Sequence, residues 1–381
     1  MSLRWRDLPA ASRRAAVVAA IALIACAVGA AREPSVFFAS WLASWIFVVG
    51  IALGSMMLVM IHELSGGRWG LVLRRPLEAA MLTLPLCALF ALPFAFGLPS
   101  LFEWARPEAV AASELLQAKR WFLNVPAFLA RNAVGLVVWS LFAIALARRL
   151  GSASPGEVRA RSRLAVAGLL VYLATMTLFA YDWVASLVAD WNSTAVGLRV
   201  GAAQFVAAVA FGVAFAALDP WMRGRPPRAT ARDFGDFGNL LLTVVMFWAY
   251  IAYTQYFIVW AEDLPHDASW YWPRTFTSWR WLAAVVLGLV FVLPFVAMLF
   301  RGVKRNPPAL GMVCIVALVG SWLDCVWLTL PSLRTEGLAL TWLDFAALIA
   351  QGGLWLAAAI AIAQRLPATA IAEMSGAGAH G

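Results

Sequence analysis

The sequence predicts an all-α polytopic membrane protein, because its apolar residues are abundant and fall in long uninterrupted blocks. Hydrophobic residues make up 63% of the 381 residues, charged residues make up 13%, and the mean hydropathy is +0.81. A soluble domain of this length needs a larger polar surface. The blocks suit a bilayer core of about 30 Å, which a helix of about 20 apolar residues can cross.

Ten such blocks predict ten transmembrane helices. They cover residues 14–31, 37–64, 76–97, 122–147, 164–188, 195–218, 237–260, 278–300, 309–330 and 341–364. The first block follows Arg4, Arg6, Arg13 and Arg14, as in a signal peptide. Because it lacks a convincing cleavage site, we expect a retained helix. The Ala/Gly-rich residues 367–381 are expected to form a disordered tail.

Loop lengths predict an internal duplication. The two longest loops on one side, residues 98–121 and 262–277, each join the second and third helices of a set of four. This spacing favours two four-helix bundles flanked by helices 1 and 10. The expected units are residues 1–35 (N-terminal arm and helix 1), 36–190 (helices 2–5), 191–335 (helices 6–9) and 336–366 (helix 10).

Lysine and arginine concentrate on one side of the predicted topology, for example at Arg74, Arg75, Arg148, Arg149 and Arg301. By the positive-inside rule this side is cytoplasmic, which places both termini in the cytoplasm and the protein in a bacterial inner membrane. The formal net charge of +9 therefore reflects orientation, and no nucleic-acid partner is expected.

Charged and amide side chains within the apolar blocks are the candidates for function, because such groups are costly at membrane depth and usually face a bundle interior. Those toward the outer face are Arg131, Asp182, Gln255, Asp324 and Asp344, and those toward the cytoplasmic face are His62, Glu78 and Asp236. Two polar sets that reach inward from opposite faces suggest a proton path made of half-channels.

A structural interpretation competes with the proton path. The cytoplasmic set can serve as helix caps at the headgroup level, with Glu78 in the first turn of a helix that Pro76 opens. Arg131 and Asp182 lie on neighbouring predicted helices and form either a structural ion pair or a functional one. Asp324 has no evident basic partner in the sequence, which favours a functional role.

Few residues of this chain can hold a cofactor. The histidines are His62, His266 and His380, so a buried haem with two histidine ligands is excluded, and no metal-ligand or Ser/His/Asp arrangement has workable spacing. The four cysteines stand singly in apolar segments. No Walker loop occurs. We expect no catalytic residue, metal or redox cofactor on this chain.

Six stretches, taken in order, carry a resemblance to a known family. They are MIHELSGGRWGLVLRRPLE (60–78), YDWVASLVADWNSTAVG (181–197), FWAYIAYTQYFIVWAEDLPHDASWYWPR (247–274), VLPFVAMLFRGVKR (292–305), LDCVWLTLP (323–331) and LDFAALIAQGGLWL (343–356). Together they resemble ActF, the second NrfD-like integral membrane subunit of bacterial alternative complex III, a quinol:electron-acceptor oxidoreductase. The stretches AEDLPHD and VADWNST depart from the family pattern, both on the outer face.

The resemblance implies an NrfD-like fold and a place in a multi-subunit complex. The implied partners are a homologous NrfD-like membrane subunit, a periplasmic iron–sulfur subunit, c-type cytochrome subunits and, as a further candidate, a terminal oxidase. Iron–sulfur clusters and haem c would reside in these partners, and the homologous subunit is the better candidate for quinol oxidation. The ActF-like chain would carry a proton path and contact lipids and quinone without a redox cofactor of its own.

Two other functions remain open. A direct quinone site in helices 2–5 would use Tyr172, Tyr181, Asp182 and Arg131, with Trp41 and Trp45 lining it. A structural scaffold would instead seat lipids and hold the extrinsic iron–sulfur and cytochrome subunits. In a scaffold the buried acids would only stabilise the fold.

Overall fold

The computed structural model describes residues 10–148, 155–218, 229–262 and 264–366, and every regular element in these ranges is helical. Nine helices among them are long and apolar enough to cross a membrane, or ten if one bent pair of helices is a single span. The chain is therefore an all-α polytopic membrane protein, as predicted. The expected disordered tail, 367–381, lies outside the described residues.

Most of the predicted spans are single long helices. They are α1 (Ala10–Arg32), α2 (Pro34–Ser65), α8 (Val125–Arg148), α9 (Pro155–Trp183), α10 (Val196–Leu218), α12 (Ala231–Glu262), α18 (Pro307–Leu333) and α19 (Trp342–Arg365). Short elements connect them: η2 (Glu103–Ala105), α6 (Pro107–Ala112), α7 (Glu114–Ala118), η3 (Ala185–Leu187), α13 (Pro265–Ala268), α14 (Trp272–Phe276) and α17 (Arg301–Lys304).

The third predicted span is broken where the sequence suggested one helix. It consists of α3 (Arg68–Met81), α4 (Leu84–Phe90) and α5 (Phe94–Leu101), and α5 is bent by 71° from the segment before it. Pro93 stands at the break and caps α5, and a proline cannot donate the backbone hydrogen bond that would continue the helix. The expectation that Pro76 opens this span is wrong, because Pro76 lies inside α3.

The eighth predicted span also departs from a regular α-helix. It runs through α15 (Trp279–Val286), the π-helical segment η4 (Leu287–Val292) and α16 (Leu293–Leu299). Pro294 is the second residue of α16, two positions after η4 ends. Its missing N–H and its ring disturb the preceding turn, which gives a physical reason for the wider π-helical turn there.

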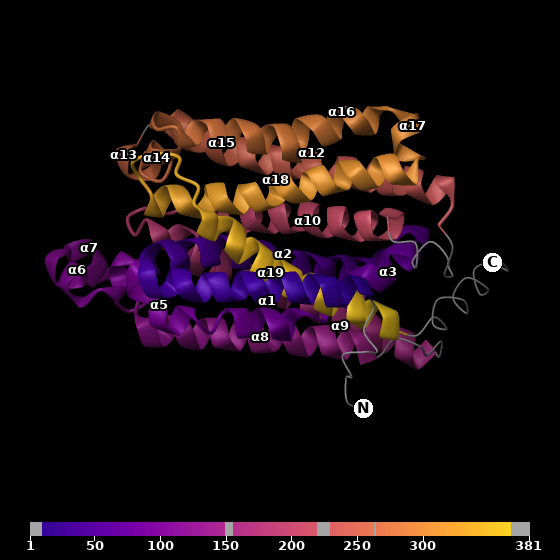
Figure 1. Cartoon of the computed structure of the whole chain (residues 1–381), viewed down its shortest axis with the longest axis horizontal. Helices are drawn as coiled ribbons and strands as arrows, with labels where there is room; N and C mark the ends of the chain where they lie inside the picture. The colour runs from indigo at the N-terminus through magenta and orange to yellow at the C-terminus, as the bar shows by residue number, and fades with distance from the viewer. Residues whose placement is uncertain (1–9, 149–154, 219–228, 263, 367–381) are drawn as a thin grey trace.

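The membrane-spanning helices lie side by side, so the molecule has two distinct ends (Figure 1). One end carries α6, α7, α13 and α14 and is called the loop end. At the other, called the terminal end, α1 begins and α19 ends. In Figure 1, α15 and α16 run along one edge and α8 along the opposite edge, with α10 and α2 between them.

Helices α2 and α10 form the centre of the molecule, because most of their side chains are buried. α2 packs against α3, α9, α10, α18 and α19, and α10 packs also against α12 and α18. α1 packs mainly against α19. The predicted internal duplication stays a prediction, since α2 contacts helices of both proposed bundles.

Small residues let the two central helices approach closely. A Cβ atom built on Gly54 of α2 would lie 2.3 Å from the Gln204 carbonyl oxygen and 2.9 Å from the Ala208 Cβ, both on α10. Neither backbone can move aside alone, because each helix is packed on all sides. In the absence of a strong hydrophobic force between helices in lipid, such close packing holds helices together.

We therefore expect Gly54→Ala to destabilise the chain by about 1–3 kcal/mol, because the added methyl group overpacks the α2–α10 contact. The matched control is Gly135→Ala on α8, where an added Cβ meets no atom within 4 Å. Unfolding of both purified variants in detergent checks this. Equal stability of the two variants would contradict the contact.

Candidate functional site: buried ion pairs and a polar cavity

The predicted pair of Arg131 and Asp182 is present at the loop end. Arg131 on α8 donates from Nη2 to Asp182 Oδ1 at 2.7 Å and from Nε to Oδ2 at 3.2 Å. Asn132 donates to the same Oδ2 at 2.9 Å and accepts from the Trp183 indole at 2.5 Å. The Asp182 residue is 1% exposed, whereas the Arg131 side chain is 22% exposed and rests on the Phe122 ring. The carboxylate thus faces the interior.

Asp324 of α18 also has a guanidinium partner, so the expectation that it lacks one is wrong. Arg199 of α10 donates from Nη1 to Asp324 Oδ2 at 3.0 Å and from Nη2 to Oδ1 at 2.5 Å. The Trp248 indole of α12 donates to Oδ2 at 3.0 Å, and its ring lies 4.9 Å from the Arg199 guanidinium carbon. Arg199 lies in the first turn of α10, inside the predicted span 195–218, and was not among the predicted site residues.

Asp344 joins the start of α19 to α2. It accepts from Arg334 at 2.8 and 3.0 Å and from the Ser40 hydroxyl at 2.6 Å. It also accepts from the Thr341 backbone N–H at 2.6 Å, in a capping box with Thr341. Both carboxylate oxygens of Asp344 are therefore engaged in holding the helix start.

At the terminal end, Glu78 belongs to a buried cluster of four charges. Arg74 donates from Nε to Glu78 at 2.5 Å and also bonds Glu63, whose second oxygen lies 3.6 Å from Arg161 Nε. Each of these side chains is less than one tenth exposed. Glu78 lies within α3, so it does not cap a helix start. His62, on the last turns of α2, contacts the Gly67 carbonyl at 3.0 Å through Nε2.

The structure brings Asp233, rather than the predicted Asp236, into the interior near the start of α12. Asp233 is buried and accepts from Arg68 at 2.7 Å and from Thr230 at 2.7 and 2.8 Å. The Asp236 side chain is exposed. Gln255, toward the loop end of the same helix, is buried and lies 3.4 Å from the Ser193 hydroxyl.

The proposed quinone residues make hydrogen bonds within the protein. Tyr172 donates to Gln204 at 2.7 Å, and Tyr181 donates to the Ser193 carbonyl at 2.9 Å. The Trp41 and Trp45 indoles donate to the Phe90 and Cys87 carbonyls at 2.8 and 2.9 Å. None of these side chains, nor Arg131 or Asp182, lines either of the two large cavities described next.

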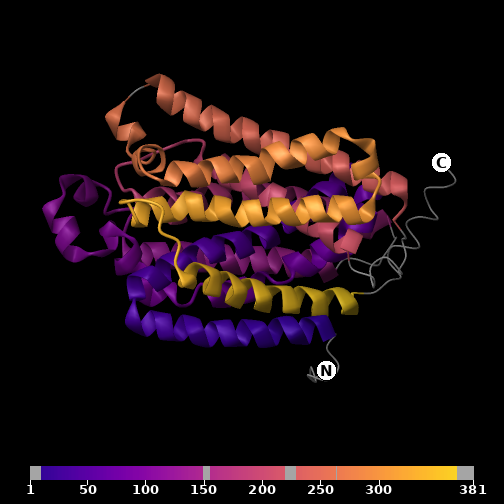
Figure 2. The same cartoon turned by 45° about the horizontal axis from the view of Figure 1, so that its top comes forward.

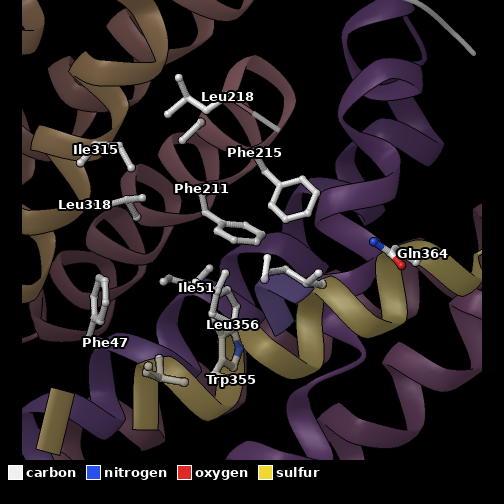
Figure 3. A pocket seen from close by; sticks show the side chains of 15 residues that line it. Phe47, Ile51, Phe211, Phe215, Leu218, Ile315, Leu318, Trp355, Leu356 and Gln364 are labelled. Carbon is white, nitrogen blue, oxygen red and sulfur yellow. The ribbon is translucent and has the colours of Figure 1, made fainter. Parts of the chain in front are cut away.

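One cavity, of about 530 Å³, is almost entirely apolar (Figure 3). It lies between α2, α10, α18 and α19, and the rings of Phe211, Phe215 and Trp355 gather around it, with the Gln364 amide at one end. Such a lining can accommodate hydrocarbon but offers little to recognise a charged group.

A second cavity, of about 440 Å³, has several polar groups and is called the α12–α15 cavity. Its lining residues come mainly from the loop-end parts of α12, α15 and α18 and from the connection before α15. α12 and α15 diverge there (Figure 2). The charged and polar lining of the cavity comprises Arg199, Gln255, Tyr256, Tyr271, Arg274, Thr275, Arg280 and Asp324. An apolar cavity with a few converging polar groups is the usual form of a small-molecule site.

Sequence reasoning missed three features of this region: Arg199, Arg274 and the cavity itself. Arg274 lies in a loop-end connection, where charges are ordinarily solvated, yet it is completely buried. A signal for it existed in the sequence, because Trp270 and Trp272 stand close before it and tryptophan faces attract arginine.

Across the described ranges, no group of three or more His, Cys, Asp or Glu side chains could hold a metal ion. No protein-family model matches the chain, and no curated protein matches it in sequence.

The Arg199–Asp324 pair provides a test of this geometry. Because either partner alone would remain as a buried charge, we expect Arg199→Met and Asp324→Leu each to cost about 3–5 kcal/mol of stability. The double variant should lose less stability than the sum of the two single losses, since it removes both charges at once. Unfolding of the four proteins in detergent measures the coupling. Strictly additive losses would show that the two side chains do not interact.

Proposed function

We propose that this chain is an integral membrane subunit of a quinol-oxidising electron-transfer complex of the alternative complex III kind, and that it contributes a proton-translocation path. It would lie in the bacterial inner membrane with both termini in the cytoplasm, so the loop end would face the periplasm. The observation that supports the path best is that carboxylates at both ends of the helical bundle are buried in the protein interior, next to guanidinium groups.

The path would begin at the loop end with Asp182 and Asp324. At the terminal end it would use Glu63, Glu78 and Asp233, the last in place of Asp236. Between them lies a buried polar pair, Tyr172 with Gln204. Gln204 is five residues from Arg199 on α10, which corresponds to about 7.5 Å of helical rise. Mobile waters or side-chain rotations would have to bridge such gaps.

The guanidinium partners set the condition for proton movement. A guanidinium beside a carboxylate favours the ionised form of that carboxylate. A proton therefore binds more readily when the pair loosens. A redox change in an adjacent subunit would supply the change in local field or hydration that opens a pair.

Electron carriers would reside in other subunits. By the sequence resemblance, these are a homologous NrfD-like membrane subunit, a periplasmic iron–sulfur subunit and c-type cytochromes. The connections that carry α6, α7, α13 and α14 gather at one end of the helices, where they would face such extrinsic subunits (Figure 1). In this arrangement the present chain binds and releases protons without oxidising quinol itself.

A structural scaffold is the second candidate, and one observation favours it. Asp344 accepts hydrogen bonds on both oxygens from Arg334, Ser40 and Thr341, which suits a helix cap better than a proton carrier. In a scaffold the pairs at Asp182 and Asp324 would serve the same stabilising purpose.

Neutralising substitutions in the intact complex distinguish the two candidates. We expect Asp182→Asn and Asp324→Asn to lower the proton-to-electron ratio in liposomes, because each removes a proton-binding group while keeping the side-chain shape. Asp324→Glu should restore part of the ratio. Asp236→Asn, at an exposed carboxylate, is the matched control and should leave the ratio unchanged. Co-purification of all subunits verifies assembly. A wild-type ratio in both assembled Asn variants would support the scaffold instead.

A further inference from the structure

The α12–α15 cavity carries an excess of positive charge. Three arginines line it, Arg199, Arg274 and Arg280, against one carboxylate, Asp324. The bidentate bond between Arg199 and Asp324 neutralises those two groups. Among the described residues no carboxylate lies within ion-pair distance of Arg274 or Arg280. The cavity wall thus holds two guanidinium charges without an anionic partner.

Arg274 is the more unusual of the two, because it is completely buried. It donates to the carbonyls of Trp270, Leu328 and Trp327 at 2.5, 2.7 and 3.2 Å and to a serine hydroxyl, and its guanidinium lies 3.3 Å from the centre of the Trp270 ring. These dipoles satisfy its hydrogen bonds but bring no negative charge. A buried charge without a counter-charge is costly, so the site favours an incoming anion.

Two hydrogen-bond donors at the cavity wall have no hydrogen-bond partner among the described residues. The Tyr271 hydroxyl has no partner among the described residues, although the Tyr271 side chain is buried. Burial raises the pKa of this phenol, while the nearby guanidinium charges of Arg199 and Arg274 act in the opposite direction. The phenol therefore remains a hydrogen-bond donor at neutral pH. The Trp327 indole N–H is buried and also lacks a partner.

The rest of the lining suits a hydrocarbon chain. Ala252 of α12 and Ala283, Ala284 and Leu287 of α15 and η4 are small or apolar. α12 packs against η4 and α16 but leaves α15 toward the loop end (Figure 2). Both helices carry exposed side chains in this region, including Tyr253 and Val285, so their outer faces suit contact with hydrocarbon. The cavity therefore combines a cationic head with an apolar side toward the bilayer.

We propose that the α12–α15 cavity binds an anionic, phosphate-bearing membrane lipid. The phosphate would take hydrogen bonds from the Arg280 guanidinium and the Tyr271 hydroxyl and would offset the buried charge of Arg274. An acyl chain would lie between α12 and α15 along Ala283. Arg280 is the second residue of α15, which puts the phosphate at the loop end, where lipid headgroups lie. This inference does not depend on proton movement through the chain.

Lipid titration of the full-length chain tests the inference. The delipidated protein in detergent is titrated with dioleoyl phosphatidylglycerol, with dioleoyl phosphatidylcholine, and with inorganic phosphate, and bound lipid is counted by native mass spectrometry. We expect retention of the anionic lipid over the zwitterionic one with the same chains. Inorganic phosphate should neither bind measurably nor displace phosphatidylglycerol, because inorganic phosphate lacks the acyl chain that packs against the apolar wall.

Two variants, each with a matched control, locate the binding. Arg280→Gln should weaken phosphatidylglycerol binding about fivefold, the usual contribution of one arginine to an anionic lipid. Arg120→Gln, at another exposed loop-end arginine, should have no effect. Ala283→Phe, which fills the apolar part, should lower binding further than Val285→Phe, which points a larger ring toward lipid. The melting temperature of each variant verifies folding.

Several outcomes would overturn the inference. Equal binding of the two lipids would show that charge does not determine binding. Wild-type binding by both cavity variants would show that the lipid binds at another site. Displacement of phosphatidylglycerol by inorganic phosphate would make the site one for a free anion. Displacement by decylubiquinone, which has a flat neutral ring, would assign the cavity to another class of ligand.

Discussion

The structure depends on one constraint: at membrane depth no water is available to solvate an ionised side chain, so every buried charge must find its partner within the protein. Asp182, Asp324 and Asp344 meet this constraint with Arg131, Arg199 and Arg334. Each pair joins different helices, or a helix to the segment before it. The pairs therefore fix helix order and depth, which hydrophobic contacts alone specify poorly in a bilayer.

The two ends of the molecule satisfy the constraint differently. At the terminal end Arg74 is shared between Glu63 and Glu78, with Arg161 beside Glu63, so acid and base are balanced in one cluster. At the loop end the pairs are separate, and Arg274 relies on carbonyl dipoles and tryptophan faces. The charge cluster at the terminal end is thus balanced, whereas Arg274 at the loop end has no carboxylate partner among the described residues.

Hydropathy was sufficient to predict the fold class and the position of most spans, because blocks of about 20 apolar residues rarely form anything other than membrane-spanning helices. The Arg131–Asp182 pair followed from two charges in adjacent predicted helices. Arg199 and Asp324 are 125 residues apart, and an arginine in a first helical turn usually reaches the headgroups, so no local pattern indicated their contact. Likewise, α12 begins at Ala231, six residues before the predicted start. Asp233 therefore lay outside the predicted span, and Asp236 was chosen in its place. The α12–α15 cavity arises from the divergence of two helices, which residue periodicity does not encode.

The pairing of α1 with α19 has a consequence for how the chain is assembled. The buried residues of α1 form a narrow stripe that includes Ala19 and Gly29, which fit against Gly353 and Leu343 of α19, and the Ser12 hydroxyl donates to the Ala357 carbonyl at 2.8 Å across 345 residues of sequence. During synthesis the first helix enters the bilayer long before its main partner exists. Until α19 has been inserted, α1 can pack only against α2. The α1–α19 contact therefore forms late in folding.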